Sequence, residues 1–182
     1  MIIGDCSQFA IEFELDKKYN GTWLYGKFCC WFSNARVGDY ETSSSLRDKL
    51  IQLAYPVYDN GNRTHEGFFP LNKEAFFYML DCALYGYGYD ISEHEAIELE
   101  RKSNEETWAR FDVSDMIEGW KIFIVENQYR TRVIVKMNGS NEIKEFSLNP
   151  KQFDNVIHRA YQAINKLYEL EVEKEKMSIR SD

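Results

Sequence analysis

A concentration of carboxylates lies at residues 90–100, which read DISEHEAIELE and contain five carboxylates, one histidine and no lysine or arginine. Residues 81–120 hold eleven Asp or Glu against three Lys or Arg, so their balance of −8 equals the net charge of the whole chain. Acidic runs are usually solvated surfaces. A negative field confined to one segment can also attract a basic protein surface and speed association with it. We therefore predict that this segment captures a cationic partner.

Residue types that could catalyse a reaction or hold a metal are sparse. The histidines are His65, His94 and His158, and none has the spacing of the H-E-x-x-H metal motif. We expect His94 to be a solvated surface residue and His158 to lie at the boundary of the core or inside it. No local signature of a Cys-His-Asp hydrolase accompanies these histidines, and Gly86 and Gly88 lack the context of a phosphate loop. The sequence therefore predicts no catalytic residue, no metal and no cofactor.

Composition narrows the class of protein. The amino end lacks the basic and apolar regions of a secretory signal, which predicts a cytoplasmic protein with reduced thiols. Its four cysteines have no Cys-x-x-Cys spacing and are expected to be small buried hydrophobic residues. No stretch approaches the roughly 20 apolar residues of a membrane span. An isoelectric point near 5.0 argues against direct binding to nucleic acid.

Hydrophobic periodicity predicts how these segments are positioned. Alternation indicates two antiparallel meanders, with strands at 9–15, 22–32 and 35–40 and at 121–127, 129–137 and 141–148. In the second meander a tight turn is predicted at Asn127-Gln128. Capping residues and helical spacing indicate helices at 46–54, from Asn72 to before YGYGYD, after Ser103, and from Pro150 onward. The acidic run is assigned a strand over 95–101. Together these elements predict one α+β domain over residues 1–172, in which helices pack the sheets, and a charged, frayed tail over 173–182.

The opening third of the chain resembles the immunity protein 42 family of bacterial polymorphic toxin and contact-dependent growth inhibition systems. The likeness rests on short glycine and aromatic motifs: Gly4-Asp5, Phe9-Ala10-Ile11, Trp23 with Tyr25-Gly26, and Gly38-Asp39 ahead of Leu46. By this resemblance the three motif glycines would set the backbone geometry, while Phe9 and Trp23 would belong to the core. Gly26, inside a predicted strand, would mark a bulge or a close backbone approach.

The resemblance implies a non-enzymatic antidote that binds one cognate toxin domain and blocks its active site or substrate path. Many toxins of these systems are nucleases with basic surfaces, which the acidic segment would complement. The toxin-binding residues are accordingly predicted to be Asp90, Glu93, Glu95, Glu98, Glu100, Tyr87, Tyr89 and Glu105, with Glu12, Glu14 and Asp16 extending the acidic face. A small cytosolic enzyme with an unrecognised pocket and a protein-interaction adaptor are the alternative functions. The oligomeric state stays open.

Overall fold

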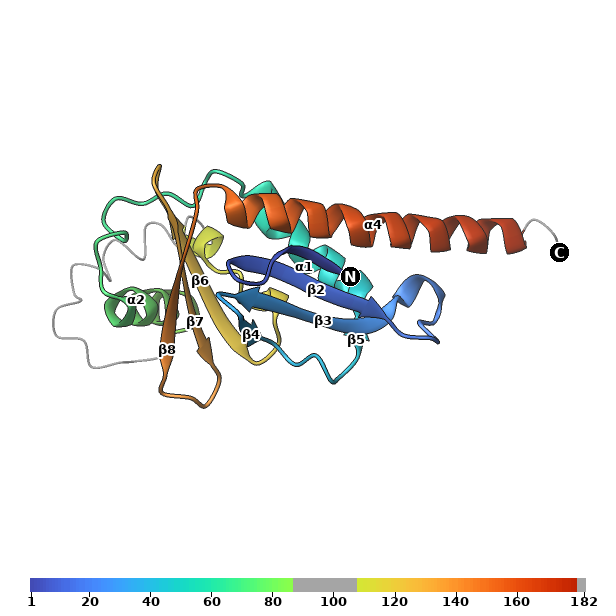
Figure 1. The fold of residues 1–182 in the computed structure, drawn as a ribbon, viewed down its shortest axis with the longest axis horizontal. Coiled ribbons are helices and arrows are strands. Elements are labelled where there is room, and N and C mark those ends of the chain that lie inside the picture. Colours follow the sequence, from blue (N-terminus) through green and yellow to red (C-terminus); the bar gives the residue numbers. More distant parts are fainter. Residues whose placement is uncertain (87–107, 180–182) are drawn as a thin grey trace. The chain divides into compact units, whose positions relative to one another are not determined.

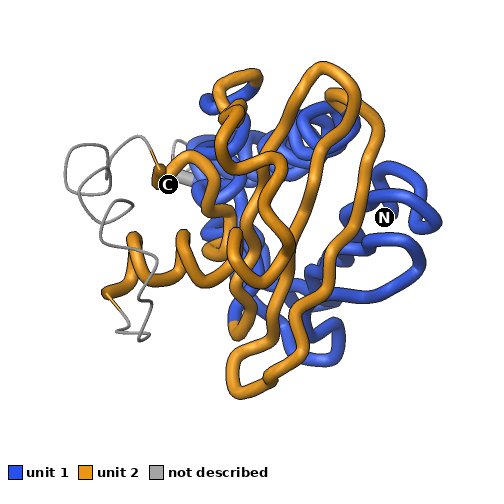
Figure 2. The backbone as a smooth tube through the Cα atoms, turned by 90° about the vertical axis from the view of Figure 1, so that its left-hand side faces the viewer, with its two compact units in different colours: residues 1–60, 116–118, 152–182 blue, residues 61–115, 119–151 orange. Residues whose placement is uncertain are grey.

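The computed structural model describes residues 1–86 and 108–179 of the 182-residue chain. The chain divides into two compact units: unit 1 comprises residues 1–60, 116–118 and 152–182, and unit 2 comprises residues 61–115 and 119–151 (Figure 2). Each unit has its own antiparallel sheet (Figure 1). The predicted α+β class with antiparallel sheets and a long C-terminal helix is confirmed. The assignment of residues 1–172 to a single domain stays a prediction.

The sheet of unit 1 has the strand order β1-β2-β3-β4, and β5 also pairs with β3. Its strands are β1 (Ile2–Asp5), β2 (Phe9–Leu15), β3 (Tyr25–Phe32), β4 (Ala35–Val37) and β5 (Ser44–Ser45). β1 has no counterpart among the predicted strands, because Ile3 alone of its four residues is buried and no alternation results. β3 begins three residues later than predicted, since Gly21–Trp23 forms a 3-10 turn ahead of it.

β3 is the central strand of this sheet. Its Gly26 allows the backbone of β2 to lie close. A Cβ atom at Gly26 would lie 2.3 Å from the backbone oxygen of Glu14, so the predicted close backbone approach is confirmed. The prediction that Trp23 belongs to the core is wrong, because its side chain is 42% exposed. Trp23 lies in the 3-10 turn before the strand, where its ring stacks on Tyr25 and under the guanidinium of Arg47.

The core of unit 1 joins its sheet to two helices, α1 (Leu46–Tyr58) and α4 (Gln152–Ile179). The ring of Phe9 stacks on Phe32 and Phe153, with centroid distances of 4.8 and 5.1 Å. α1 begins at the predicted cap, where the Ser45 hydroxyl accepts a hydrogen bond from the backbone N–H of Asp48. The predicted end of α1 at residue 54 is wrong. The missing N–H of Pro56 removes one helical hydrogen bond, which the helix tolerates in its last turn, and the side chain of Pro56 is buried.

α4 confirms the predicted helical periodicity, since the apolar side chains at positions 153, 157, 160 and 164 are all fully buried. Most of the segment predicted as a frayed tail is helical through Ile179. The prediction for His158 is wrong: its side chain is exposed, with Nε2 2.9 Å from Nε2 of Gln162. One position past Ile157, it lies about 100° around the helix from that buried residue.

Unit 2 contains the second predicted meander, with the strand order β6-β7-β8. Its elements are β6 (Trp120–Glu126), β7 (Thr131–Met137), β8 (Ile143–Leu148) and α2 (Lys73–Tyr85), together with the 3-10 turn at Ala109–Phe111. Asn72 caps α2 as predicted, and the helix ends at Gly86, whose φ is 70°. Aromatic side chains dominate the core, among them Phe68, Phe76, Phe77, Trp108, Phe111 and Phe123. None of the helices within the described residues combines the length and hydropathy needed to span a bilayer.

Candidate functional site

The predicted acidic interface lies outside the described residues. All eight of its members, from Tyr87 to Glu105, and also His94 and the strand predicted over 95–101, fall within residues 87–107. Of the carboxylates predicted to extend it, Glu12 accepts a hydrogen bond from Nε1 of Trp31 at 2.9 Å and is therefore engaged within its own sheet. Glu14 is exposed on the same strand.

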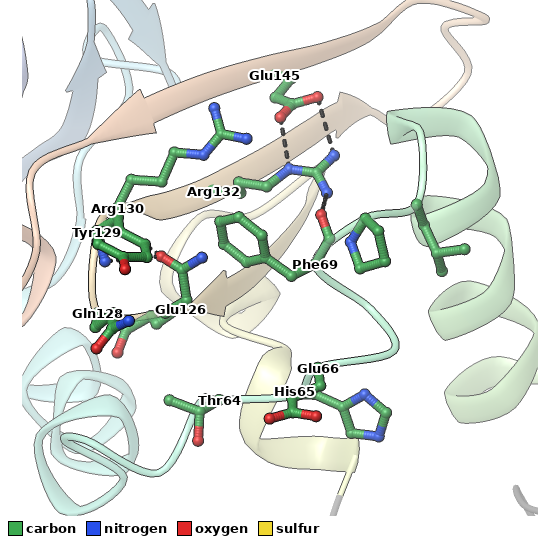
Figure 3. A pocket seen from close by; sticks show the side chains of 13 residues that line it. Thr64, His65, Glu66, Phe69, Glu126, Gln128, Tyr129, Arg130, Arg132 and Glu145 are labelled. Carbon is green, nitrogen blue, oxygen red and sulfur yellow. Dashed lines mark hydrogen bonds and ion pairs between the residues drawn. The ribbon is translucent and has the colours of Figure 1, made fainter.

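A cavity of about 880 Å³ lies within unit 2, between the segment 64–71 and the β6–β7 turn (Figure 3). Residues of that segment, of the turn and of the strands β6, β7 and β8 line it. The parallel bridge from Thr64 to Glu126 brings the segment alongside the end of β6. The cavity includes aromatic and proline side chains, two arginines and three glutamates. Such a mixture of apolar surface and a few oriented polar groups is typical of binding sites.

Phe69 is the central aromatic residue of this cavity. Two guanidinium groups lie near its ring, with Cζ of Arg130 5.2 Å and Cζ of Arg132 5.7 Å from the ring centroid. Both distances are within the range in which a cation is attracted to an aromatic ring. Phe69 therefore contacts two arginines, Arg132 in β7 and Arg130 in the turn that leads into it.

Arg132 is held by three contacts and is only 4% exposed. Its Nε and Nη2 donate to the two carboxylate oxygens of Glu145 at 2.7 and 3.2 Å, and its Nη1 donates to the backbone oxygen of Phe69 at 2.5 Å (Figure 3). This bidentate geometry is the strongest form of an arginine–carboxylate pair. Arg132 thus fixes β7, β8 and the segment around Phe69 together.

The β6–β7 turn is fixed by Asn127. Its side-chain oxygen accepts hydrogen bonds from the backbone N–H groups of Tyr129 and Arg130 at 2.9 and 3.0 Å, and its own N–H donates to the oxygen of Arg130 at 3.1 Å. Asparagine is favoured at such turns because its side chain can replace a backbone partner. The turn leaves Tyr129 74% exposed beside the cavity. The sequence predicts this turn, but it does not reveal that the turn borders a cavity.

The opposite wall carries His65 and Glu66. The His65 ring stacks on Phe68 at a centroid distance of 3.7 Å, and its Nδ1 accepts a hydrogen bond from the N–H of Phe68 at 3.2 Å. Nδ1 therefore carries no proton, which leaves Nε2 as the protonated nitrogen of the neutral ring. His65 is thus part of the loop structure.

A buried ion pair lies next to the cavity. Arg63 is fully buried, and its Nε lies 3.8 Å from Oε1 of Glu126, which is 8% exposed. The backbone N–H of Glu126 also donates to the oxygen of Arg63 at 2.8 Å. Within residues 1–86 and 108–179, no group of three or more His, Cys, Asp or Glu side chains is placed to hold a metal ion.

Comparison with known proteins gives two findings. The sequence profile of the family described as immunity protein 42 matches residues 1–163. The fold is similar to a solved structure titled "Crystal structure of CdiI from Burkholderia dolosa AUO158", with a TM-score of 0.66 and 17% identity over 90% of this chain and 99% of that chain. At that identity the likeness concerns the fold alone. No curated protein matches the sequence.

Proposed function

Since this chain belongs to the immunity protein 42 family, we propose that it binds a cognate bacterial toxin domain and neutralises it by occluding the active site or the substrate path. The observation that carries the proposal is the family match over residues 1–163. The protein would act in the cytoplasm by binding alone, without catalysis or cofactor.

We assign the first contact with the toxin to the acidic segment at residues 87–107. Its carboxylates are at positions 90, 93, 95, 98, 100, 105 and 106, against Arg101 and Lys102. A toxin that degrades nucleic acid needs a basic surface, and an anionic segment would compete with the nucleic acid for that surface. A nuclease-type toxin is therefore the class that we propose as partner.

The direct test of the proposed function is coexpression of this chain with the toxin domain encoded beside its gene. We expect the two proteins to copurify as a one-to-one complex, and cells that make both to grow. Growth arrest despite equal expression of this chain, together with no complex by size-exclusion chromatography, would contradict the proposed function.

The assignment of the acidic segment is tested by charge reversal. Replacing Glu93, Glu95 and Glu98 by Lys should slow association with the toxin domain about tenfold or more at low salt, because charge complementarity acts mainly on the on-rate. The matched control replaces Glu118, Glu142 and Glu173, which are exposed and change the net charge equally. Equal on-rates for the two triple variants would place the contact elsewhere on the protein.

A further inference from the structure

The two arginines beside Phe69 differ in what their guanidinium groups contact. Arg132 donates to Glu145 and to a backbone oxygen, so its charge is neutralised inside the protein. Arg130 is exposed, and within residues 1–86 and 108–179 its guanidinium meets the ring of Phe69 and no carboxylate. Of this pair, only Arg130 is open to an external anion.

Arg130 is also held in place before any partner arrives. Its backbone is fixed by the hydrogen bonds of the Asn127 turn, and its side chain rests on Phe69. A guanidinium presents a planar fork of N–H donors that matches the two oxygens of a carboxylate. Because turn and ring limit its freedom beforehand, binding loses less conformational entropy than it would with a mobile arginine.

The surroundings of Arg130 select a particular kind of anion. Glu126 and Glu145 are paired with Arg63 and Arg132, but Glu66 also lines the cavity, so a multiply charged phosphate would meet more repulsion there than a singly charged group. A single carboxylate meets less repulsion and can pair with Arg130 in the bidentate manner. The exposed ring of Tyr129 adds apolar contact area, and exposed Tyr and Arg side chains are the types that dominate binding energy at protein interfaces.

We infer that Arg130 docks an aspartate or glutamate side chain of the toxin domain at this cavity, with Tyr129 packing beside the contact. This inference rests on the proposed function. It adds a second contact with the toxin, of opposite charge to the first, at the cavity of unit 2. The acidic segment would speed encounter with a basic surface, whereas Arg130 would fix the register of the bound complex.

The test measures binding of the purified toxin domain to Arg130→Ala, Arg130→Lys and wild-type protein by biolayer interferometry. Arg130→Ala should raise Kd about tenfold or more, mostly through faster dissociation, because the contact is short-ranged. Arg130→Lys should fall between wild type and the alanine variant, since an ammonium keeps the charge but loses the bidentate fork. Arg159→Ala, which removes an exposed arginine of α4, is the matched control and should bind like wild type.

The outcomes separate this inference from the proposed function. If wild type binds the toxin domain and Arg130→Ala binds equally well, the inference is overturned while the immunity function stands. If wild type itself neither binds nor protects cells, the proposed function fails. A double-mutant cycle between Arg130→Ala and each Asp or Glu substitution on the toxin should show one strongly coupled pair, and a cycle without coupling would also overturn the inference. Equal melting temperatures of the variants exclude unfolding as the cause.

Discussion

Unit 1 and unit 2 are both small antiparallel sheets packed by helices, but they bury different chemistry. In unit 1 the interior is dominated by stacked rings and aliphatic side chains around Phe9. Unit 2 has a comparable aromatic core and in addition buries the pair of Arg63 with Glu126, and Arg132, whose partner Glu145 is exposed. Of the buried charged side chains of unit 2 among the described residues, Arg63, Glu126 and Arg132 lie in or next to one cavity. Those of unit 1, Lys49 and Asp154, belong to two different helices, α1 and α4.

The difference between the buried side chains of the two units separates those that stabilise the fold from those that fix the geometry of the cavity. Apolar burial stabilises without direction, so the core of unit 1 can vary in detail as long as its volume is kept. A buried ion pair adds little net stability compared with apolar residues of the same size, but it demands a defined geometry. Unit 2 therefore has a wall whose side chains are fixed in position, and Arg130 gains its fixed place from that wall.

Of the variants that test this difference, the replacement of Arg63 is expected to change stability most. Arg63→Met should lower the free energy of unfolding by about 3–5 kcal/mol, because it leaves the buried Glu126 without its adjacent cation. The double variant Arg63→Met with Glu126→Leu should recover most of that loss, since no buried charge then remains. Urea unfolding monitored by tryptophan fluorescence measures both values.

If the double variant were as unstable as the single one, the ion pair itself would be a main source of stability, and the contrast between the units would disappear. Arg36→Met is a suitable control in unit 1. Arg36 is paired with Glu41 at 3.8 Å at the surface, so its removal should change stability by less than about 1 kcal/mol.

A smaller effect is expected from the buried thiols of unit 1. Burial, and next to it the carboxylate of Glu12, raises the pKa of Cys29 to about 12. The unfolded thiol has its ordinary pKa of 9.0, so the protonated folded thiol contributes full stability below pH 9, and this is lost as the pH rises towards 12. At pH 10 this group alone should destabilise the protein by roughly 1 kcal/mol.

Melting temperatures of wild type and Cys29→Ala between pH 8 and pH 10 check this prediction. The alanine variant starts less stable but should lose less on going to pH 10. Parallel curves for the two proteins would mean that Cys29 ionises in the folded state as readily as in the unfolded one. Cys82→Ala in unit 2 serves as a control, because Cys82 is only partly buried.

Sequence predicted local features of the fold better than long-range ones. The caps at Ser45 and Asn72, the turn at Asn127 and the apolar face of α4 depend on neighbours within four residues, and all four are confirmed. β1 escaped prediction because a short edge strand with one buried residue has no period of its own. The strand predicted from residue 22 begins only at Tyr25, because the alternation of side chains continues through the 3-10 turn that contains Trp23.

The cavity in unit 2 could not have been predicted, because it depends on contacts between distant segments. Phe69 and Arg132 are 63 residues apart, and the bridge from Thr64 to Glu126 spans a similar distance. A single signal was available in the sequence: the arginines at 130 and 132 occupy one side of a predicted strand. That spacing pairs them in space but does not indicate which one is neutralised by Glu145.

The smallest expected difference in this comparison lies between the losses at the two helix caps, a local device that both units share. Asn72→Ala should destabilise by about 1 kcal/mol, because the N–H of Ala75 loses its 2.8 Å hydrogen bond at an exposed helix start. Ser45→Ala should lose more, about 1.5–2 kcal/mol, because the Ser45 hydroxyl is almost buried and also donates to the oxygen of Trp23 at 3.2 Å. Ser45→Thr and Asn72→Asp keep a capping oxygen and should restore most of each loss. Equal losses for the two alanine variants in urea unfolding would mean that the bond to Trp23 adds nothing, and that both helices depend on their caps to the same extent in spite of their different surroundings.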